Sequence, residues 1–276
     1  MTATLTEHPP TPGPTAPAAA RRSWVPAPLR HSAALARRGL IKTIHSPEAL
    51  LDVTLQPIIF LLLFVYVFGG AIAGSSDDYL QYALPGVLLQ TVVFASAGTG
   101  VGLAEDLKTG IFDRFRSLPI SRAAPLVGAV GADLVRYITS GVIMLAFGFA
   151  LGYRTSAGPL AVLGAFGLVV LFAFAMCWIF TALGVVSREP RSVQGISAMI
   201  MLPLTFASSV FVPVETMPDW LRPFAEVNPV SRCADAVRAL LAGEPAAAAT
   251  TASLVTSAIV VAIFAPLAVT LYRRRT

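Results

Sequence analysis

Six stretches of this chain contain no Asp, Glu, His, Lys or Arg, and each is long enough to cross a membrane as a helix. They are residues 53–74, 83–103, 137–153, 159–186, 195–214 and 246–272. Roughly 20 apolar residues at 1.5 Å per residue cross the hydrocarbon layer, where backbone polar groups must be paired within a helix or a closed barrel. No alternating pattern of barrel strands is present, so the sequence predicts an all-α integral membrane protein with six transmembrane helices. Charged residues are 13% of the chain, against about 25% in soluble domains, which excludes a soluble globular fold.

Basic residues are unevenly divided between the two sets of connections that alternate along these stretches. Fifteen Lys and Arg side chains fall in one set, which includes both ends of the chain. Only four fall in the other set: Arg154, Arg222, Arg232 and Arg238. Because Lys and Arg in short connections stay on the cytoplasmic side, we expect a multi-pass protein of the cytoplasmic membrane with both termini inside.

The sequence divides into three parts. Residues 1–27, rich in Pro, Thr and Ala, have too little apolar surface to pack and are expected to form a disordered cytoplasmic tail. Residues 28–51 alternate apolar side chains with cations at helical spacing, which predicts an amphipathic helix on the inner membrane surface, in contact with anionic membrane lipids. Contact of that helix with a cytoplasmic partner is the alternative. Residues 52–276 form the six-span transmembrane domain.

The cytoplasmic connection at residues 104–122 carries an amphipathic segment between two helix-breaking residues, Gly110 and Pro119. Two aromatic residues are interleaved there with three charged ones: Phe112, Asp113, Arg114, Phe115 and Arg116. A solvated turn is one interpretation. Exposed phenylalanines between charges favour the other, a short helix that docks into a partner protein.

Asp133 and Arg136 are three residues apart, so they share a helix face. A charged site inside the bilayer is one interpretation. Residues 137–153 are just long enough to span without them, so we predict instead an interfacial charge pair at the inner membrane surface.

The external connection at residues 215–245 is broken repeatedly by proline. Asn228 followed by Pro229 is typical of a helix start, and the following residues place Val230, Val237 and Leu241 with Ala234 on one face. We expect short, half-inserted re-entrant helices that cover the outer end. A plain surface helix is the alternative.

Several functional classes are disfavoured by what the spans lack. Proton- and sodium-coupled carriers commonly keep Asp, Glu or His within their spans, and all three histidines precede residue 53. The phosphate-binding loop of ATPases requires Gly before its Lys, but Ile41 precedes Lys42 and Leu107 precedes Lys108. No cluster of catalytic or metal-ligating residues is evident at one depth. We therefore expect no catalytic, metal or cofactor site in this chain, no nucleic-acid partner, and an ATP-hydrolysing partner if ATP drives it.

A set of short motifs, in order along the six stretches, resembles ABC type-2 export permeases, and most closely the daunorubicin-resistance DrrB-like branch. The motifs are Leu84-Pro85-Gly86, Glu105-Asp106 with Gly110 and Arg114, Leu118-Pro119-Ile120-Ser121-Arg122, Phe211 with Pro213, Met217-Pro218 and Asn228-Pro229. The resemblance runs from about Arg30 to the C-terminus.

The resemblance implies a permease subunit that pairs with a separate ABC ATPase, which uses ATP and Mg²⁺, with two copies of each in the exporter. Residues 110–117 would be the coupling helix, whose aromatic side chains enter a groove of the ATPase. The second and fifth spans would line the route of an amphipathic, drug-like compound through candidate pathway residues: Gln90, Thr91, Ser96, Thr99, Met199, Met201 and Phe206. Ordinary helix packing by small and polar residues is the alternative role for these side chains.

Export of an antibiotic, giving resistance, is the function that this resemblance favours. Export of a lipid or glycolipid is compatible with the same residues. An ATPase-independent channel or carrier, or a membrane-bound scaffold or lipid-modifying enzyme, remain alternatives of other classes. ATP-independent flux through the chain alone would distinguish the channel from the exporter.

Overall fold

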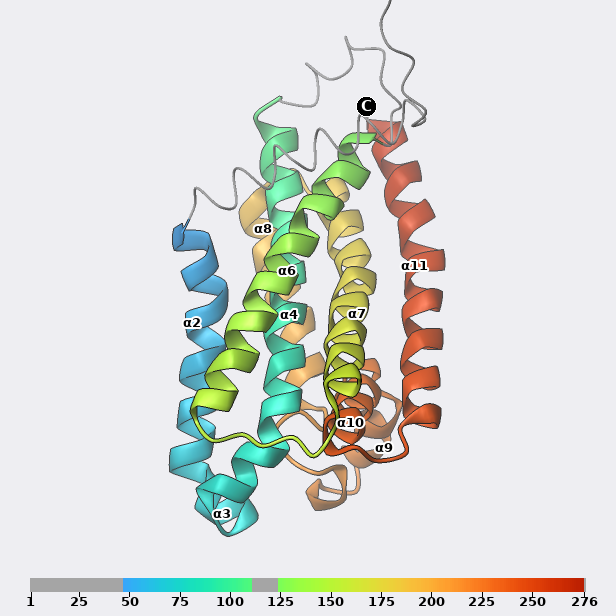
Figure 1. Ribbon diagram of the computed structural model, residues 1–276. Coiled ribbons are helices and arrows are strands. Elements are labelled where there is room, and N and C mark those ends of the chain that lie inside the picture. Colours follow the sequence, from blue (N-terminus) through green and yellow to red (C-terminus); the bar gives the residue numbers. More distant parts are fainter. Residues whose placement is uncertain (1–46, 111–123, 276) are drawn as a thin grey trace, which may run out of the picture.

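The protein is a bundle of long helices with a layer of short helices across one end (Figure 1). The structure is a computed structural model in which residues 47–110 and 124–275 are described. Their elements are α2 Pro47–Leu63, η1 Phe64–Phe68, α3 Gly69–Ala73, α4 Ser76–Lys108, α6 Ala124–Ala150, α7 Pro159–Val186, α8 Pro190–Phe206, η2 Val214–Thr216, α9 Arg222–Val227, α10 Pro229–Ala242 and α11 Ala247–Arg275. The expected tail at 1–27 lies outside the described residues. So do most of the expected interfacial helix at 28–51, whose last residues begin α2, and most of the expected coupling helix.

Five helices among the described residues are long and apolar enough to cross a membrane. They cover residues 55–73, 76–108, 128–150, 159–186 and 247–275, and they correspond to five of the six uncharged stretches. The remaining stretch, 195–214, forms α8 and the irregular segment after it. That helix has 17 residues, or about 25 Å of length, and it ends just after Pro203.

The first span is one rod of α2, η1 and α3 that contains a π-helical turn at Phe64–Phe68. Such turns interrupt the regular hydrogen-bond ladder. The rod ends at Gly74, whose φ of 82° is in the left-handed region that favours glycine. Ser75 then caps α4 by accepting a hydrogen bond from the amide of Asp78 at 3.0 Å. A tight turn therefore connects two antiparallel helices.

The centre of the bundle is α4, which packs most extensively against α7 and also contacts α2, α6, α8 and α10. Most of α4 from Tyr79 to Ala104 is buried. On its other side, α7 packs against α11. The outer faces of α2 and α11 expose Leu, Ile and Val side chains, as expected for helices in contact with lipid.

The short helices η2, α9 and α10, with the segments that join them, lie at the end opposite the C-terminus (Figure 1). We call residues 207–245 the cap, and α10 attaches it to the bundle. Asn228 caps α10 by accepting from the amide of Val230 at 2.9 Å. One face of α10, including Val230, Val237 and Leu241, is fully buried where the helix packs against α4, α7 and α11. The predicted helix start and the predicted buried face are thus present, and α10 is part of the bundle's core at this end.

Candidate functional site

The C-terminal end of α4 is where the predicted coupling segment begins. Gly110 has a φ of 69°, and its amide bonds the carbonyl of Leu107 at 3.4 Å, so glycine ends the helix in the left-handed conformation. Lys108 pairs with Glu189 of the α7–α8 connection, with 2.7 Å between nitrogen and oxygen. Among the predicted coupling residues the structure describes Gly110; Phe112, Asp113, Arg114, Phe115 and Arg116 lie outside the described residues.

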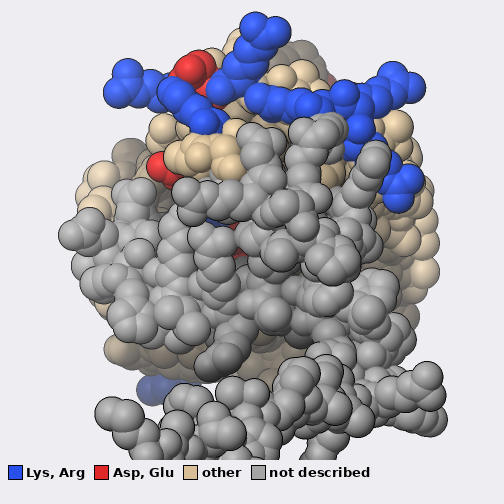
Figure 2. Space-filling view, turned by 90° about the horizontal axis from the view of Figure 1, so that it is seen from above, with Lys and Arg blue, Asp and Glu red and all other residues tan. Residues whose placement is uncertain are grey.

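Basic side chains gather at this same end of the bundle, as the view onto it shows (Figure 2). The α11 terminus reaches the α7 terminus here, since Arg275 donates to the carbonyl of Ser187 at 2.7 Å and to that of Val185. The described basic residues on these termini and connections are Lys108, Arg188, Arg191, Arg273, Arg274 and Arg275. All of them belong to the larger basic set predicted from the sequence.

The smaller basic set lies at the other end. Arg154 follows α6, and its amide bonds the side-chain oxygen of Gln81 near the start of α4 at 3.1 Å. Arg238 of α10 also reaches α4, because its guanidinium bonds the carbonyl of Tyr82 at 3.2 Å. Among the described residues, the members of the two basic sets therefore occupy opposite ends of the bundle.

The predicted pathway residues on α4 are packed inside the bundle. Gln90, Thr91, Ser96 and Thr99 are all buried. Thr91 and Ser96 donate to backbone carbonyls of their own helix at 2.7 and 2.5 Å, and Thr99 bonds the Tyr137 hydroxyl of α6 at 2.5 Å. In a single copy these four side chains are packed inside the bundle, and Thr99 joins α4 to α6. Whether they also line a route stays a prediction.

The predicted pathway residues on α8 point in different directions. Met201 is buried, whereas Met199 is 77% exposed. Phe206 is partly exposed and stacks on Phe211, with 5.2 Å between ring centroids. The exposed face of α8 also includes the polar residue Gln194, which was not among the residues predicted from the sequence.

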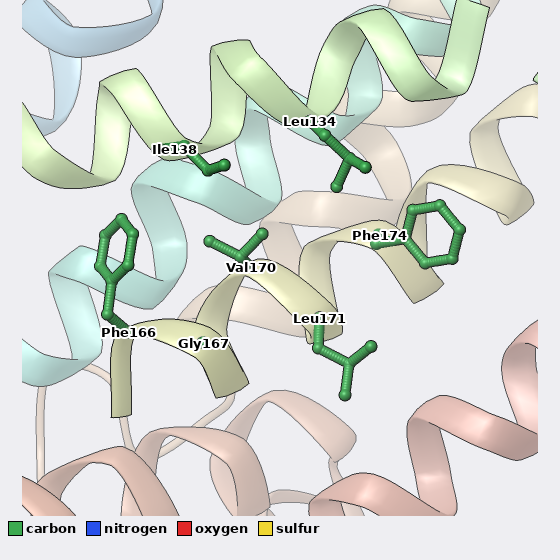
Figure 3. A pocket seen from close by; sticks show the side chains of 7 residues that line it. All are labelled: Leu134, Ile138, Phe166, Gly167, Val170, Leu171 and Phe174. Atoms are coloured by element: carbon green, nitrogen blue, oxygen red, sulfur yellow. The ribbon is translucent and has the colours of Figure 1, made fainter. Parts of the chain in front are cut away.

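An open apolar groove of about 410 Å³ lies between α6 and α7 (Figure 3). Its lining residues are Leu134 and Ile138 of α6 with Phe166, Gly167, Val170, Leu171 and Phe174 of α7. None of them is polar and none belongs to the predicted route. No group of three or more His, Cys, Asp or Glu side chains comes together within metal-binding reach in residues 47–110 and 124–275.

Asp133 and Arg136 of α6 form an ion pair that contacts α4, and its position at the inner membrane surface stays a prediction. Arg136 and Asp133 are 3.1 Å apart, and each side chain is 15% exposed. Arg136 also donates to the carbonyl of Ala95 on α4 at 2.8 Å. Helix α6 begins at Ala124, well before the uncharged stretch, and its candidate span of 128–150 includes both charged residues.

The polar network that fixes the cap was not predicted from the sequence. Arg238 stacks over the Tyr82 ring at 4.0 Å, bonds the carbonyl of Ser209 at 2.9 Å and pairs with Asp235 at 2.7 Å. Ser209 in turn donates to Asp235 at 2.7 Å. The one available signal was the i, i+3 spacing of Asp235 and Arg238, which says nothing about α4.

The structure explains why the Leu84-Pro85-Gly86 motif has glycine at its third position. A Cβ at this position would lie 2.5 Å from the carbonyl oxygen of Val210, so glycine is required where the segment after α8 crosses α4. Tyr79, two turns earlier, donates its hydroxyl to the carbonyl of Phe211 at 2.7 Å. The segment after α8 is therefore bound directly to the N-terminal half of α4.

Several long apolar helices, a basic end and a capped opposite end define a multi-pass membrane protein. Comparison with known proteins narrows this class: residues 31–242 match the family described as ABC-2 type transporter, and the chain belongs to that family.

Individual relatives are similar over most of their length. The chain is 42% identical over 256 residues to the "Daunorubicin resistance ABC transporter permease protein DrrB1" of Streptomyces coeruleorubidus, covering 93% of this chain and 89% of the relative. It is 30% identical over 228 residues to the "Doxorubicin resistance ABC transporter permease protein DrrB" of Mycobacterium tuberculosis, covering 80% and 75%. A "Putative transport permease ycf38" of Cyanophora paradoxa is 26% identical over 211 residues, covering 75% and 72%. The family predicted from the motifs is thereby confirmed.

Proposed function

We propose that this chain is the permease subunit of an ATP-driven exporter that moves an amphipathic, drug-like compound such as an anthracycline out of the cell. The observation that carries the proposal is the 42% identity over 93% of the chain to a permease named for daunorubicin resistance. The chain lacks the Gly-Lys-Ser/Thr sequence of the phosphate-binding loop. A separate ABC ATPase, binding ATP and Mg²⁺, would therefore supply the energy. Export of the compound by the assembled transporter would make the cell resistant to it.

In this proposal α8 completes a sixth crossing. Its start is tied to the end of α4 by Lys108 and Glu189, and the segment that follows it reaches the opposite half of α4 at Gly86. The basic end, which holds the C-terminus, would face the cytoplasm because Lys and Arg stay preferentially on that side. The cap formed by α9 and α10 would then lie outside.

We also propose that two copies pair through the exposed face of α8. Gln194, in the first turns of α8, is exposed in a single copy, and a Gln side chain can hydrogen-bond to a neighbouring membrane helix. Beside it, Gly195 has no atom within 4 Å of an added Cβ, and such small residues let a second helix approach closely. A second copy would cover this face and place Met199 between the two chains. Flexible methionine side chains adapt to ligands of different shape, which suits a route for amphipathic compounds.

The coupling contact is proposed for the segment after Gly110. The helix before it ends at a defined glycine, and the segment carries Phe112 and Phe115 among charged residues. Aromatic side chains in pockets commonly dominate the energy of protein interfaces. In the ATPase groove, Phe112 and Phe115 would provide the binding energy, and Asp113, Arg114 and Arg116 would pair with charges around it.

The test is export by the chain and its ATPase purified together and placed in proteoliposomes. ATP-dependent movement of daunorubicin is expected, and the double variant Phe112→Ala/Phe115→Ala should lose both ATPase co-purification and export. Phe224→Ala is the matched control, because Phe224 is an exposed phenylalanine of the cap. Equal flux without the ATPase would favour a channel or carrier. Movement of a labelled lipid but not of the drug would favour lipid export.

A further inference from the structure

The ion pair between Asp133 and Arg136 lies inside a candidate span, where charged side chains are costly and mark functional sites. The span covers residues 128–150. Arg136 is eight residues past its start, about 12 Å along the helix axis. Both side chains face the protein, since each is 15% exposed.

The pair fastens α6 to α4 through the backbone of α4. Arg136 donates one guanidinium hydrogen bond to the carbonyl of Ala95 at 2.8 Å and pairs with Asp133 at 3.1 Å. Gly98 leaves room for this guanidinium, since an added Cβ would lie 3.0 Å from its terminal nitrogen. The neighbouring residues Tyr137 and Thr99 add a hydroxyl contact of 2.5 Å. Arg136 and Tyr137, which are adjacent on α6, thus both bond to α4 within the stretch 95–99.

This contact is placed symmetrically about the segment that joins the two helices. Ala95 precedes the end of α4 at Lys108 by 13 residues. Arg136 follows the start of α6 at Ala124 by 12 residues. The part of each helix between this contact and the connecting segment, which we call an arm, is therefore about 20 Å long. The contact of Asp133 and Arg136 with Ala95, which we call the clamp, joins the two arms at the ends far from that segment.

We propose that Asp133 and Arg136 are positioning residues for energy coupling, because they make α4 and α6 move as one unit when the segment between them is displaced. Asp133 balances the charge of the Arg136 guanidinium and, by pairing with it, holds it in position to bond the carbonyl of Ala95. Without the clamp, a displacement of the segment would bend or separate the arms and would not reach the core of the bundle around α7. The inference rests on the proposed function, in which that segment contacts the ATPase.

The experiment compares drug moved per ATP hydrolysed for variants in the proteoliposomes described above. Gly98→Leu displaces the guanidinium while leaving both charges in place, and we expect drug per ATP to fall about tenfold with ATP hydrolysis within about twofold of the original chain. Gly102→Leu is the matched control, because no atom lies within 4 Å of its added Cβ. It should leave drug per ATP unchanged.

A second variant, Asp133→Asn/Arg136→Gln, removes the charges and should reproduce the loss. Arg136→Lys, which keeps the charge and one donor toward Ala95, should retain more coupling than Arg136→Gln. If both Gly98→Leu and the charge-removed variant move as much drug per ATP as the unaltered chain, the proposed role of the pair in coupling is wrong. Failure of both to assemble with the ATPase, while Gly102→Leu assembles, would show a purely structural pair and would overturn it too. Absence of drug movement with the unaltered chain would instead refute the proposed function.

Discussion

Gly100 of α4 and Gly184 of α7 face each other where the two helices cross. A Cβ on Gly184 would collide with the backbone carbonyl of Gly100, and a Cβ on Gly100 would collide with that of Phe180. Small residues let membrane helices approach closely, because their association depends on packing and not on burial from water. This close backbone contact between α4 and α7 therefore depends on the absence of two side chains.

The first prediction concerns this crossing. Gly184→Val should destabilise the protein by more than about 3 kcal/mol, since overpacking is worst where only backbone could move. The measurement is the temperature at which the detergent-solubilised protein loses its monodisperse peak in size-exclusion chromatography. Gly164→Val, also on α7 but with no atom within 4 Å of an added Cβ, should change it little. The same loss temperature for both variants would contradict the close contact of α4 and α7 at Gly100 and Gly184.

The extent of the helices could be predicted only in part from uncharged stretches. Length and apolar composition identify membrane helices because hydrocarbon demands both. Charged residues were taken as boundaries, so the uncharged stretch was drawn from residue 137, with Asp133 and Arg136 on the helix before it. Helix α6 begins at Ala124, and its candidate span begins at residue 128. A candidate span can include these two residues because Asp133 and Arg136 neutralise each other and contact α4. That contact joins residues far apart in the sequence, so it leaves no local signal.

Helix caps were predictable because their signals are local. Asn228, before Pro229, starts α10 as expected. Gly110 follows the last residues of α4 and ends that helix. Both act through neighbouring backbone groups. The contacts of Gly86 with Val210 and of Arg238 with Tyr82 join distant segments. Nothing in the spacing of those residues could have paired them. For the same reason, the burial of the four candidate pathway residues on α4 could not be foreseen.

A second prediction concerns Asn228, which is 3% exposed and joins the end of α8 to the start of α10. Its amide nitrogen donates to the carbonyls of Leu204 and Ala207 at 2.8 and 2.9 Å, and its oxygen caps α10. Asn228→Ala should cost about 3 kcal/mol, because it removes a cap and leaves two partly buried carbonyls without this donor. Asn228→Asp keeps the capping oxygen but turns a carboxylate oxygen toward the carbonyls of Leu204 and Ala207, so its thermal midpoint should also fall below that of the original chain. A midpoint for Asn228→Ala equal to that of the original chain would contradict this role.

A third prediction concerns the arginine that fastens the cap. Arg238→Met removes the ring contact with Tyr82 and the bonds to Ser209 and Asp235, so the cap should open more often. Limited proteolysis should then cut residues 207–245 at least about fivefold faster, since local opening exposes backbone to proteases. Arg232→Met is the control, because Arg232 is exposed and bonds only the nearby carbonyl of Glu226 at 3.3 Å among the described contacts. Equal cleavage rates in both variants would contradict the assigned role of Arg238.

A fourth prediction concerns the Cys233 thiol of α10. Burial disfavours the thiolate and raises the pKa of Cys233 from 9.0 to about 12. Thiolate is the reactive form, so Cys233 should react with maleimide much more slowly than an exposed thiol, and its labelling rate should rise about tenfold per pH unit between pH 7 and 10. Asp219→Cys, at a side chain that is 99% exposed, should label rapidly and level off near pH 9. Rapid labelling of Cys233 at pH 7 in the folded protein would show that α10 is not packed against the bundle.

The last prediction tests the direction in which the bundle crosses the membrane. Asp219 lies in the cap and Glu105 near the basic end of α4, and both are exposed. If the basic end is cytoplasmic, a membrane-impermeant maleimide added to whole cells should label Asp219→Cys at once and Glu105→Cys only after permeabilisation. The native cysteines, Cys177 and Cys233, are free but buried, so the unaltered chain gives the background. The reverse labelling pattern would place the cap inside, where the predicted coupling segment could not meet a cytoplasmic ATPase.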